Sequence, residues 1–467
     1  MKRIDVLPDD VLLEIFDFYV IVIHPSYSGK TEIEGWQTLV HVCRRWRGLV
    51  LGSPHRLNLR LYCTPETPAK DRLDIWPALP LIVGGYMTSS RTDNVIAALG
   101  QSSRICCVSL NVGTVDGRRF EEFLGAMQVP FPELTELQLS SYGETVPVIP
   151  DSFLGGSAPR LRCFDLFGIS FPGLPNLILS ATHLVDLALQ NICHSWYISP
   201  EVMVTLLSVL SSLRKLSLGF KYPQSRPDWE TRRPPPPKRS ILPTLEKFRF
   251  KGVTEYLDDL VTFIDTPQLY EIHIYLFNQI DFDCPRLAQF INRTPKLMAP
   301  DGAYVQFDNN TARVTLQYWT YYIQDGLQIN ILCGEPDWQL SSVEQVCTNS
   351  LPLLLAVEDL YIECLHLKLV WKDDAIENTL WLQLLLPFTG VINLYLSKEF
   401  ARGIAAALKD LVGGRITEVL PILQNIFVEA LEASGPFQKD IGQFVAARQL
   451  SDHAVAVSDW NKYIKPR

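Results

Sequence analysis

Few residues of this sequence have types and spacings that suit chemistry. Gly29-Lys30-Thr31 matches the end of a phosphate-binding loop, but that loop needs a glycine five residues before Gly29, where His24 stands. Without it the chain lacks the cradle of backbone N–H groups that holds a phosphate. The eight histidines are dispersed, and no Gly-x-Ser-x-Gly, His-Glu-x-x-His or Gly-x-Gly-x-x-Gly pattern occurs.

Two pairs of adjacent carboxylates are the remaining candidates for acid/base chemistry, Asp258-Asp259 and Asp373-Asp374. Neighbouring side chains point apart on a helix or a strand, so neither pair brings its carboxylates together. We expect both pairs to be solvated. The sequence therefore predicts no catalytic, cofactor-binding or metal-binding residues, and a protein that is not an enzyme.

The ten cysteines also lack the spacing of a metal site or a disulfide framework. No Cys-x-x-Cys or Cys-x-x-His occurs, and the adjacent Cys106 and Cys107 cannot normally pair without strain. We interpret the cysteines as reduced thiols in the core of an intracellular protein, in the cytoplasm, the nucleus or both.

Length and composition indicate a folded chain with more than one part. With 467 residues and 47% hydrophobic content, it can bury a large core and exceeds most single domains. A net charge of -9 argues against nucleic-acid and anionic-membrane partners. Acidic residues near the start argue against a secretion signal. Pro387 and Gly390 interrupt the longest charge-free run, residues 378–397, which favours a helix, a turn and a strand over a membrane span.

Residues 7–50 predict two or three short amphipathic helices. Pro8 suits a first helical position, and Asp9 and Asp10 fall in the positively polarised first turn. Apolar residues at helical spacing predict a single stripe on the first helix: Val11, Leu12, Ile15, Phe16, Tyr19 and Val20. A second set has the same spacing: Trp36, Leu39, Val40, Cys43, Trp46 and Val50. So small a unit needs the rest of the chain or a partner to cover its apolar surface.

The Leu-Pro start, the Ile15-Phe16 pair and the segment Val42-Cys43-Arg44-Arg45-Trp46-Arg47 occur in the order that an F-box has, and the block resembles one. The resemblance implies that seven residues belong to the surface or inner packing that meets a Skp-type adaptor: Leu7, Pro8, Ile15, Phe16, Val42, Cys43 and Trp46. Residues 21–35 make a longer connection than the family usually has. An ordinary N-terminal helical hairpin is the alternative.

The rest of the chain repeats a Leu-x-x-Leu-x-Leu phrase. Its nine copies begin at Leu134, Leu161, Leu184, Leu213, Leu245, Leu269, Val357, Val391 and Leu423. Several follow a Pro-x-Leu start, and a proline there ends the preceding segment and sets up an extended one. Helical patterns run between the phrases, over residues 120–127, 202–210, 256–264, 287–291, 380–386 and 400–412. Residues 298–350 are irregular, although 313–316 and 328–331 have the pattern of strands.

Alternating strands and helices at a nearly constant period are typical of a leucine-rich-repeat solenoid, in which stacking covers the apolar side of each unit. The pattern is degenerate, and a non-repeating α/β protein is the alternative. An F-box before such repeats, with Trp381-Leu382-Gln383 and Ala446-Ala447-Arg448-Gln449 near the end, resembles the large F-box family of mushroom-forming fungi.

Residues 223–243 are rich in proline and arginine. Such a segment favours polyproline II and cannot join a sheet, so we interpret it as an insertion in a repeat loop. The alternative is a docking ligand for a proline-recognising domain or an acidic partner.

We therefore expect an α/β protein, with a three-helix F-box over residues 1–54 and a leucine-rich-repeat-like solenoid with a curved parallel sheet over 55–467. The resemblance implies the substrate-recognition subunit of a cullin-type (SCF) ubiquitin ligase. Its partners would be a Skp-type adaptor, cullin through that adaptor, and an unknown protein substrate, without nucleic acid or membrane. A non-ligase interaction scaffold is the alternative function. For the substrate surface we consider Ile198, Trp229, Trp319, Tyr321, Tyr322 and Trp338.

Overall fold

The computed structural model describes residues 7–19, 35–69, 73, 78–143, 146–224, 226–227, 239–278, 282–297, 300–317, 326–365, 376–431 and 435–460. The chain divides into two compact units, Met1–Trp196 and Tyr197–Arg467. The sequence features at Gly29-Lys30-Thr31, Asp373-Asp374, the 21–34 connection, Trp229, Trp319, Tyr321 and Tyr322 lie outside the described residues.

The first unit begins with three short helices, α1 (Asp9–Tyr19), α2 (Gly35–Val42) and α3 (Arg44–Gly52). Strands and helices then alternate: β1 (Leu61–Cys63), β2 (Leu81–Thr88), α5 (Thr92–Leu99), β3 (Ile105–Thr114), α6 (Gly117–Ala126), β4 (Glu136–Ser140), β5 (Cys163–Phe167), α7 (Leu174–Ser180) and β6 (Asp186–Ile192). Short 3-10 turns occupy Ser102–Arg104, Phe153–Gly156 and His194–Trp196.

The second unit continues the alternation. Its elements are β7 (Lys215–Phe220), β8 (Ser240–Ile241), β9 (Lys247–Gly252), β10 (Ile264–Asp265), β11 (Glu271–Leu276), β12 (Gly302–Phe307), β13 (Thr311–Gln317), β14 (Gly326–Leu332), β15 (Asp359–Cys364), β16 (Asn393–Leu396), β17 (Asn425–Glu429) and β18 (Ala456–Trp460). The helices are α8 (Pro200–Leu207), α9 (Thr254–Thr262), α10 (Pro285–Asn292), α11 (Pro336–Ser350), α12 (Asn378–Leu385), α13 (Lys398–Lys409) and α14 (Pro436–Leu450), with a 3-10 turn at Pro352–Ala356.

All nine predicted phrases form strands, and neighbouring strands pair in parallel. In the first unit Leu137 lies opposite Phe164, which lies opposite Leu187. In the second unit Leu216, Phe248 and Ile272 align in the same way. All six side chains are buried, so equivalent positions of successive repeats form continuous apolar columns. This register is that of leucine-rich-repeat-like units.

A recurring turn begins each phrase. The N–H of Leu134 donates to the carbonyl of Phe131, and the N–H of Leu269 donates to the carbonyl of Thr266. The first residue of each of the other seven phrases makes the same bond to the carbonyl three residues before it. In five copies a proline follows that carbonyl, at the turn position where its fixed φ is favoured.

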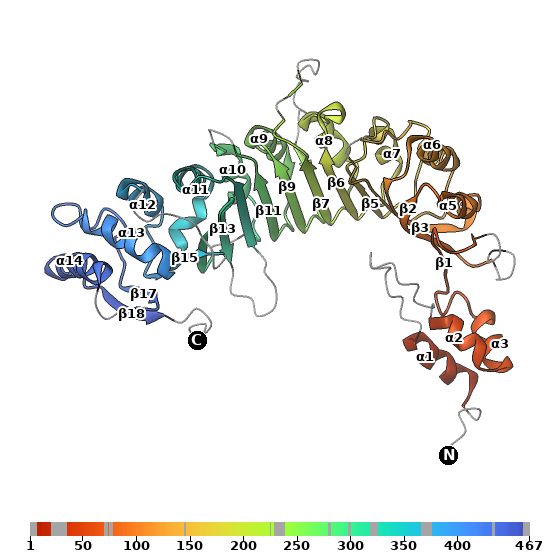
Figure 1. Ribbon diagram of the computed structural model, residues 1–467, viewed down its shortest axis with the longest axis horizontal. Helices are drawn as coiled ribbons and strands as arrows, with labels where there is room; N and C mark the ends of the chain where they lie inside the picture. The colour runs from red at the N-terminus through yellow and green to blue at the C-terminus, as the bar shows by residue number, and fades with distance from the viewer. Residues whose placement is uncertain are drawn as a thin grey trace. The chain divides into compact units, whose positions relative to one another are not determined.

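Helices cover one face of the strands in each unit (Figure 1), and the apolar columns fill the space between the two layers. The six helical patterns expected from the sequence coincide with α6, α8, α9, α10, α12 and α13. Residues 378–397 form α12, a turn and β16, as expected. Among the described helices, none is long and apolar enough to span a bilayer.

The sheet of the second unit departs from a purely parallel order. The order of its middle strands is β11-β14-β13-β12-β15, and β13 is antiparallel to both of its neighbours. Only residues 308–310 connect β12 to β13, too few for the crossover that a parallel pair requires. The expectation of a parallel sheet therefore fails at β13.

The structure corrects two local expectations. Asp258 and Asp259 are not solvated, because Asp258 accepts the N–H groups of Arg286 and Leu287 and Asp259 pairs with Arg286 at 2.8 Å. The segment 223–243 does join a sheet, because Ser240 and Ile241 pair in parallel with Ile264 and Asp265. Its residues 225 and 228–238 lie outside the described residues.

Candidate functional site

The outer face of α1, made of Val11, Ile15 and Phe18, is apolar and exposed. These side chains recur at spacings of four and three residues, and they are 41%, 46% and 77% exposed. Leu12, Leu13 and Phe16 lie buried on another side of the same helix. The predicted apolar stripe is therefore only partly covered: its Leu12 and Phe16 are buried, whereas its Val11 and Ile15 are exposed on an uncovered apolar side.

The buried side of α1 packs within the three-helix unit. The ring of Phe16 lies 4.8 Å from the ring of Trp46 on α3, centroid to centroid. On α2, Trp36, Leu39 and Val40 are buried, and Trp36 Nε1 donates to the carbonyl of Arg60 at 3.0 Å. Helices α1–α3 thus have a core of their own. Among the described residues, the outer face of α1 does not contribute to that core.

Arg45 joins the beginnings of α1 and α3. Its Nη2 donates to Asp9 Oδ1 at 2.5 Å and to the carbonyl of Leu7 at 2.6 Å. Val42 and Cys43 immediately precede α3, so this contact brings them to the end of the unit where Leu7 and Pro8 lie. Val42 is 56% exposed, and Pro8 and Cys43 are also exposed.

The seven residues expected to meet an adaptor therefore fall into two groups. Pro8, Ile15, Val42 and Cys43 are exposed, whereas Phe16 is fully buried and Leu7 and Trp46 are half-buried. Cys43 also accepts the N–H of Trp46 and so begins α3. Val11 and Phe18 were missed as surface residues, because helical spacing alone does not tell which apolar side of a helix is covered.

A second exposed surface is the strand face, opposite the helices. In the second unit it carries a basic group that we call the basic strand face: Lys215 on β7, Lys247, Arg249 and Lys251 on β9, and Arg313 on β13. These positions alternate with buried residues such as Phe248 and Phe250, so they project away from the core. The sequence analysis did not identify this surface.

Glu271 on β11 is the carboxylate at the centre of the basic strand face. Its side chain is 5% exposed, accepts from Lys247 Nζ, and lies 3.3 Å from Arg249 Nη2. Burial alone would raise the pKa of Glu271, but the hydrogen bonds from Lys247 and Arg249 hold it below its usual range. Burial, helped by Arg249, Lys247 and Arg313, lowers the pKa of the neighbouring His273.

From β12 onward the strand face carries an aromatic ladder of Tyr304, Tyr361, Tyr395 and Phe427. Successive ring centroids lie 4.4, 4.2 and 4.7 Å apart with nearly parallel planes. The residues are in register on β12, β15, β16 and β17. Trp460 of β18 packs against Tyr361 and Tyr395. Burial raises the pKa of Tyr304 to about 12.

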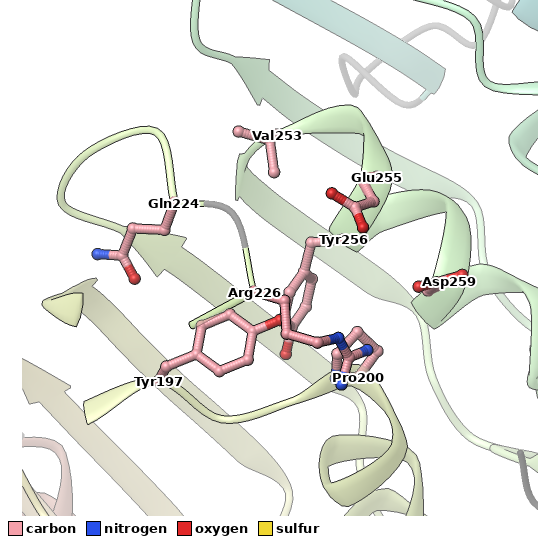
Figure 2. A pocket seen from close by; sticks show the side chains of 8 residues that line it. All are labelled: Tyr197, Pro200, Gln224, Arg226, Val253, Glu255, Tyr256 and Asp259. Atoms are coloured by element: carbon pink, nitrogen blue, oxygen red, sulfur yellow. The ribbon is translucent and has the colours of Figure 1, made fainter. Parts of the chain in front are cut away.

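A small open pocket, with a cavity volume of only about 10 Å³, lies near the start of the proline-rich segment (Figure 2). Figure 2 shows Tyr197, Arg226 and Tyr256 converging in it. Arg226 makes a bidentate ion pair with the buried Glu201, with an Nη2–Oε1 distance of 2.9 Å. The hydroxyl of Tyr256 donates to the carbonyl of Ile198 at 2.9 Å. These groups bind one another and anchor the start of the segment.

The other candidates from the sequence are dispersed. Ile198, considered as a surface anchor, is 6% exposed, so that expectation is wrong, whereas Trp338 is half exposed. All ten cysteines are free thiols, and five of them are buried. Among the described residues, no three His, Cys, Asp or Glu side chains gather as metal ligands would.

Comparisons with known proteins return matches among solved structures alone. No protein-family model matches the chain, and a search of curated proteins returns no match. Among solved structures, the chain is similar to the leucine-rich repeat-containing protein LegL7 from Legionella pneumophila. The identity is 12% and the TM-score 0.27, over 85% of this chain and 99% of that chain. The repeat character of the chain rests on the strand register described above.

Proposed function

We propose that this chain is the substrate-recognition subunit of a cullin-type ubiquitin ligase. Helices α1–α3 bind a Skp-type adaptor, and the strand face of the repeats binds the protein to be modified. The chain makes no bond itself. It holds a target lysine near the ubiquitin-carrying enzyme, which raises the effective concentration of the two reactants.

The uncovered apolar side of α1 is the observation that carries this proposal. Val11, Ile15 and Phe18 gain nothing from exposure, since burying one such side chain is worth about 1.5 to 3 kcal/mol. A helix that is apolar on a second side is typical of an interface. The N-terminal motif that resembles an F-box gives that interface a partner, a Skp-type adaptor.

Capture of the tagged full-length chain from a eukaryotic lysate tests the proposal. We expect the wild type to retain both adaptor and cullin, and Ile15→Glu to lose both. Leu179→Glu on α7 is the matched control, because Leu179 is 49% exposed and Ile15 is 46% exposed. Failure of the folded wild type to retain the adaptor would contradict the proposal.

The second candidate is a non-ligase interaction scaffold, favoured by the strand face itself, which presents polar and aromatic side chains independently of α1–α3. Such a scaffold binds its partners without ubiquitination. Two results would support the scaffold over the ligase: capture of the adaptor without cullin, or capture of neither. In both cases the strand face should still bind its partner protein.

A further inference from the structure

The basic strand face has an unbalanced positive charge. Its strand positions hold five cations, Lys215, Lys247, Arg249, Lys251 and Arg313, beside one carboxylate, Glu271, which pairs with Lys247 and Arg249. The whole chain carries a net charge of -9, so the positive charge of this surface is opposite in sign to the net charge of the molecule. Such a patch attracts a negatively charged partner.

Strand register brings these cations together although they lie far apart in the sequence. Lys215 is opposite Lys247, which is opposite Glu271. Lys251 is opposite Tyr275, and Tyr275 and Arg313 are both opposite Asn330 on β14. Adjacent strands lie about 4.8 Å apart, and alternate residues of one strand lie about 6.6 Å apart. Alternate side chains of an extended peptide are also about 6.6 Å apart, so they match the spacing of the charges along one strand.

The most exposed cations are available for a partner. Arg249 is 57% exposed despite its contact with Glu271, and Lys251 is exposed, with its ammonium 5.5 Å from the Phe277 ring centroid. Glu271 already neutralises part of the charge of Lys247, to which it is hydrogen-bonded. Arg313 Nε donates to Asn330 Oδ1 at 2.8 Å, which fixes the direction of its guanidinium.

The charged strand-face positions described outside this surface are acidic. In the first unit they include Glu136, Asp165 and Asp186, on β4, β5 and β6. Beyond β12 in the second unit they include Asp359, Glu363 and Glu429. These positions would therefore repel an acidic partner segment, and the basic strand face would attract it. Repulsion and attraction together would direct the segment to the basic strand face.

We propose that the basic strand face binds an extended segment of a partner protein rich in Asp and Glu. A peptide fits better than a nucleic acid, because Glu271 stands among the cations and few rings are open to stack on bases. Tyr275 is exposed, but the rings of the neighbouring aromatic ladder stack on one another, and Tyr361 and Tyr395 are buried. Nucleic-acid grooves combine cations with several stacking rings. This inference deepens the proposed function, since the segment would belong to the recognised substrate, but the binding itself needs no adaptor.

The test is direct binding of the purified full-length chain to a fluorescein-labelled peptide of alternating Glu and Ser, measured by anisotropy. We expect the wild type to bind it and to ignore the corresponding Lys-Ser peptide, with affinity falling as salt rises. Arg249→Glu with Lys251→Glu should weaken binding by about tenfold or more. The two side chains lie on the solvent side of β9, so equal thermal midpoints will verify that the fold is intact.

The matched control is Arg118→Glu with Arg160→Glu, which changes the net charge equally at exposed positions off the strand face. It should bind the Glu-Ser peptide as the wild type does. Equal weakening by both double variants would overturn the proposal, because the attraction would then belong to the whole molecule. Absence of binding by the wild type, or tighter binding of a single-stranded RNA that is lost with the Arg249/Lys251 variant, would also overturn it.

Two cross-checks separate this inference from the ligase proposal. Ile15→Glu should keep full affinity for the Glu-Ser peptide, and the Arg249/Lys251 variant should still capture the adaptor. If the wild type captures the adaptor but does not bind the peptide, only the proposal for the basic strand face is contradicted. If the wild type binds the peptide but does not capture the adaptor, only the ligase proposal is contradicted.

Discussion

Asp165 and Arg448 show at the level of single residues how burial changes the cost of a charge. Burial, helped by the carboxylate of Asp186, raises the pKa of Asp165 to about 6. Arg448 is fully buried and donates to the carbonyls of Pro421, Val419 and Leu420. The structural role of Arg448 is to tie α14 to the preceding turn.

Asp165→Asn should stabilise the protein at pH 8, by on the order of 2 kcal/mol. The folded-state pKa of Asp165 lies above its unfolded value, so its contribution to stability is fully present below about pH 4 and is lost as pH rises through about 6. The gain from the substitution should therefore shrink by pH 5. Urea unfolding at both pH values measures this, with the exposed Asp452→Asn as control. A loss of stability at pH 8 would contradict the account.

Arg448→Lys should destabilise the protein by about 2 to 4 kcal/mol, because one ammonium cannot replace the guanidinium's bonds and leaves buried carbonyls unsatisfied. Arg415→Lys is the control, since Arg415 is exposed and pairs with the exposed Glu418. Urea midpoints of the two variants give the comparison. Equal midpoints would mean that the buried guanidinium has no special role.

The sequence predicts the elements that belong to the repeated phrase better than the elements that do not. The nine phrases were found because their apolar positions alternate and begin with a turn, and all nine became strands. Strands β2 and β3 were missed because they lack the phrase, and α11 and α14 because no phrase frames a helical pattern there. The strand patterns at 313–316 and 328–331 became β13 and β14, but the antiparallel direction of β13 was missed because it depends on connections, not on periodicity.

Neither candidate surface could be assigned from the sequence, for two different reasons. On α1 the apolar residues were identified, but spacing could not separate Ile15, which is exposed, from Phe16, which is buried. The cations of the basic strand face are spread from Lys215 to Arg313, and only strand register brings them together. One signal was available in the sequence: the position between the last two apolar residues of each phrase faces away from the core. Arg249 and His273 occupy this position in their phrases.

Trp460→Ala should destabilise the last repeats by about 3 to 5 kcal/mol, the range for removing a buried tryptophan. Trp460 is 7% exposed and packs on Tyr361 and Tyr395. Repeat proteins depend on nearest-neighbour contacts, so hydrogen exchange should rise in β16 and β17 and stay unchanged in β7 and β9. The half-exposed Trp338→Ala serves as control. A uniform rise throughout the second unit would contradict this local view.

For the whole molecule, we propose separate tasks for separate surfaces. The apolar side of α1 would bind an adaptor, and the basic strand face would select an acidic segment. Each unit supplies its own core, and repeat stacking presents the strand-face side chains in rows. In this proposal the chain contributes to ubiquitination by holding two partners close together.

The most direct test of the central claim is the affinity of the purified chain for a purified Skp-type adaptor, measured by titration calorimetry. The account predicts that Ile15→Glu weakens binding by about tenfold or more without lowering the thermal midpoint, as expected for an interface anchor. Phe16→Ala, at a fully buried position, should lower the stability of α1–α3, whereas Leu179→Glu should change neither quantity. If Ile15→Glu binds the adaptor as tightly as the wild type, or the folded wild type does not bind it, the outer face of α1 is not an adaptor surface.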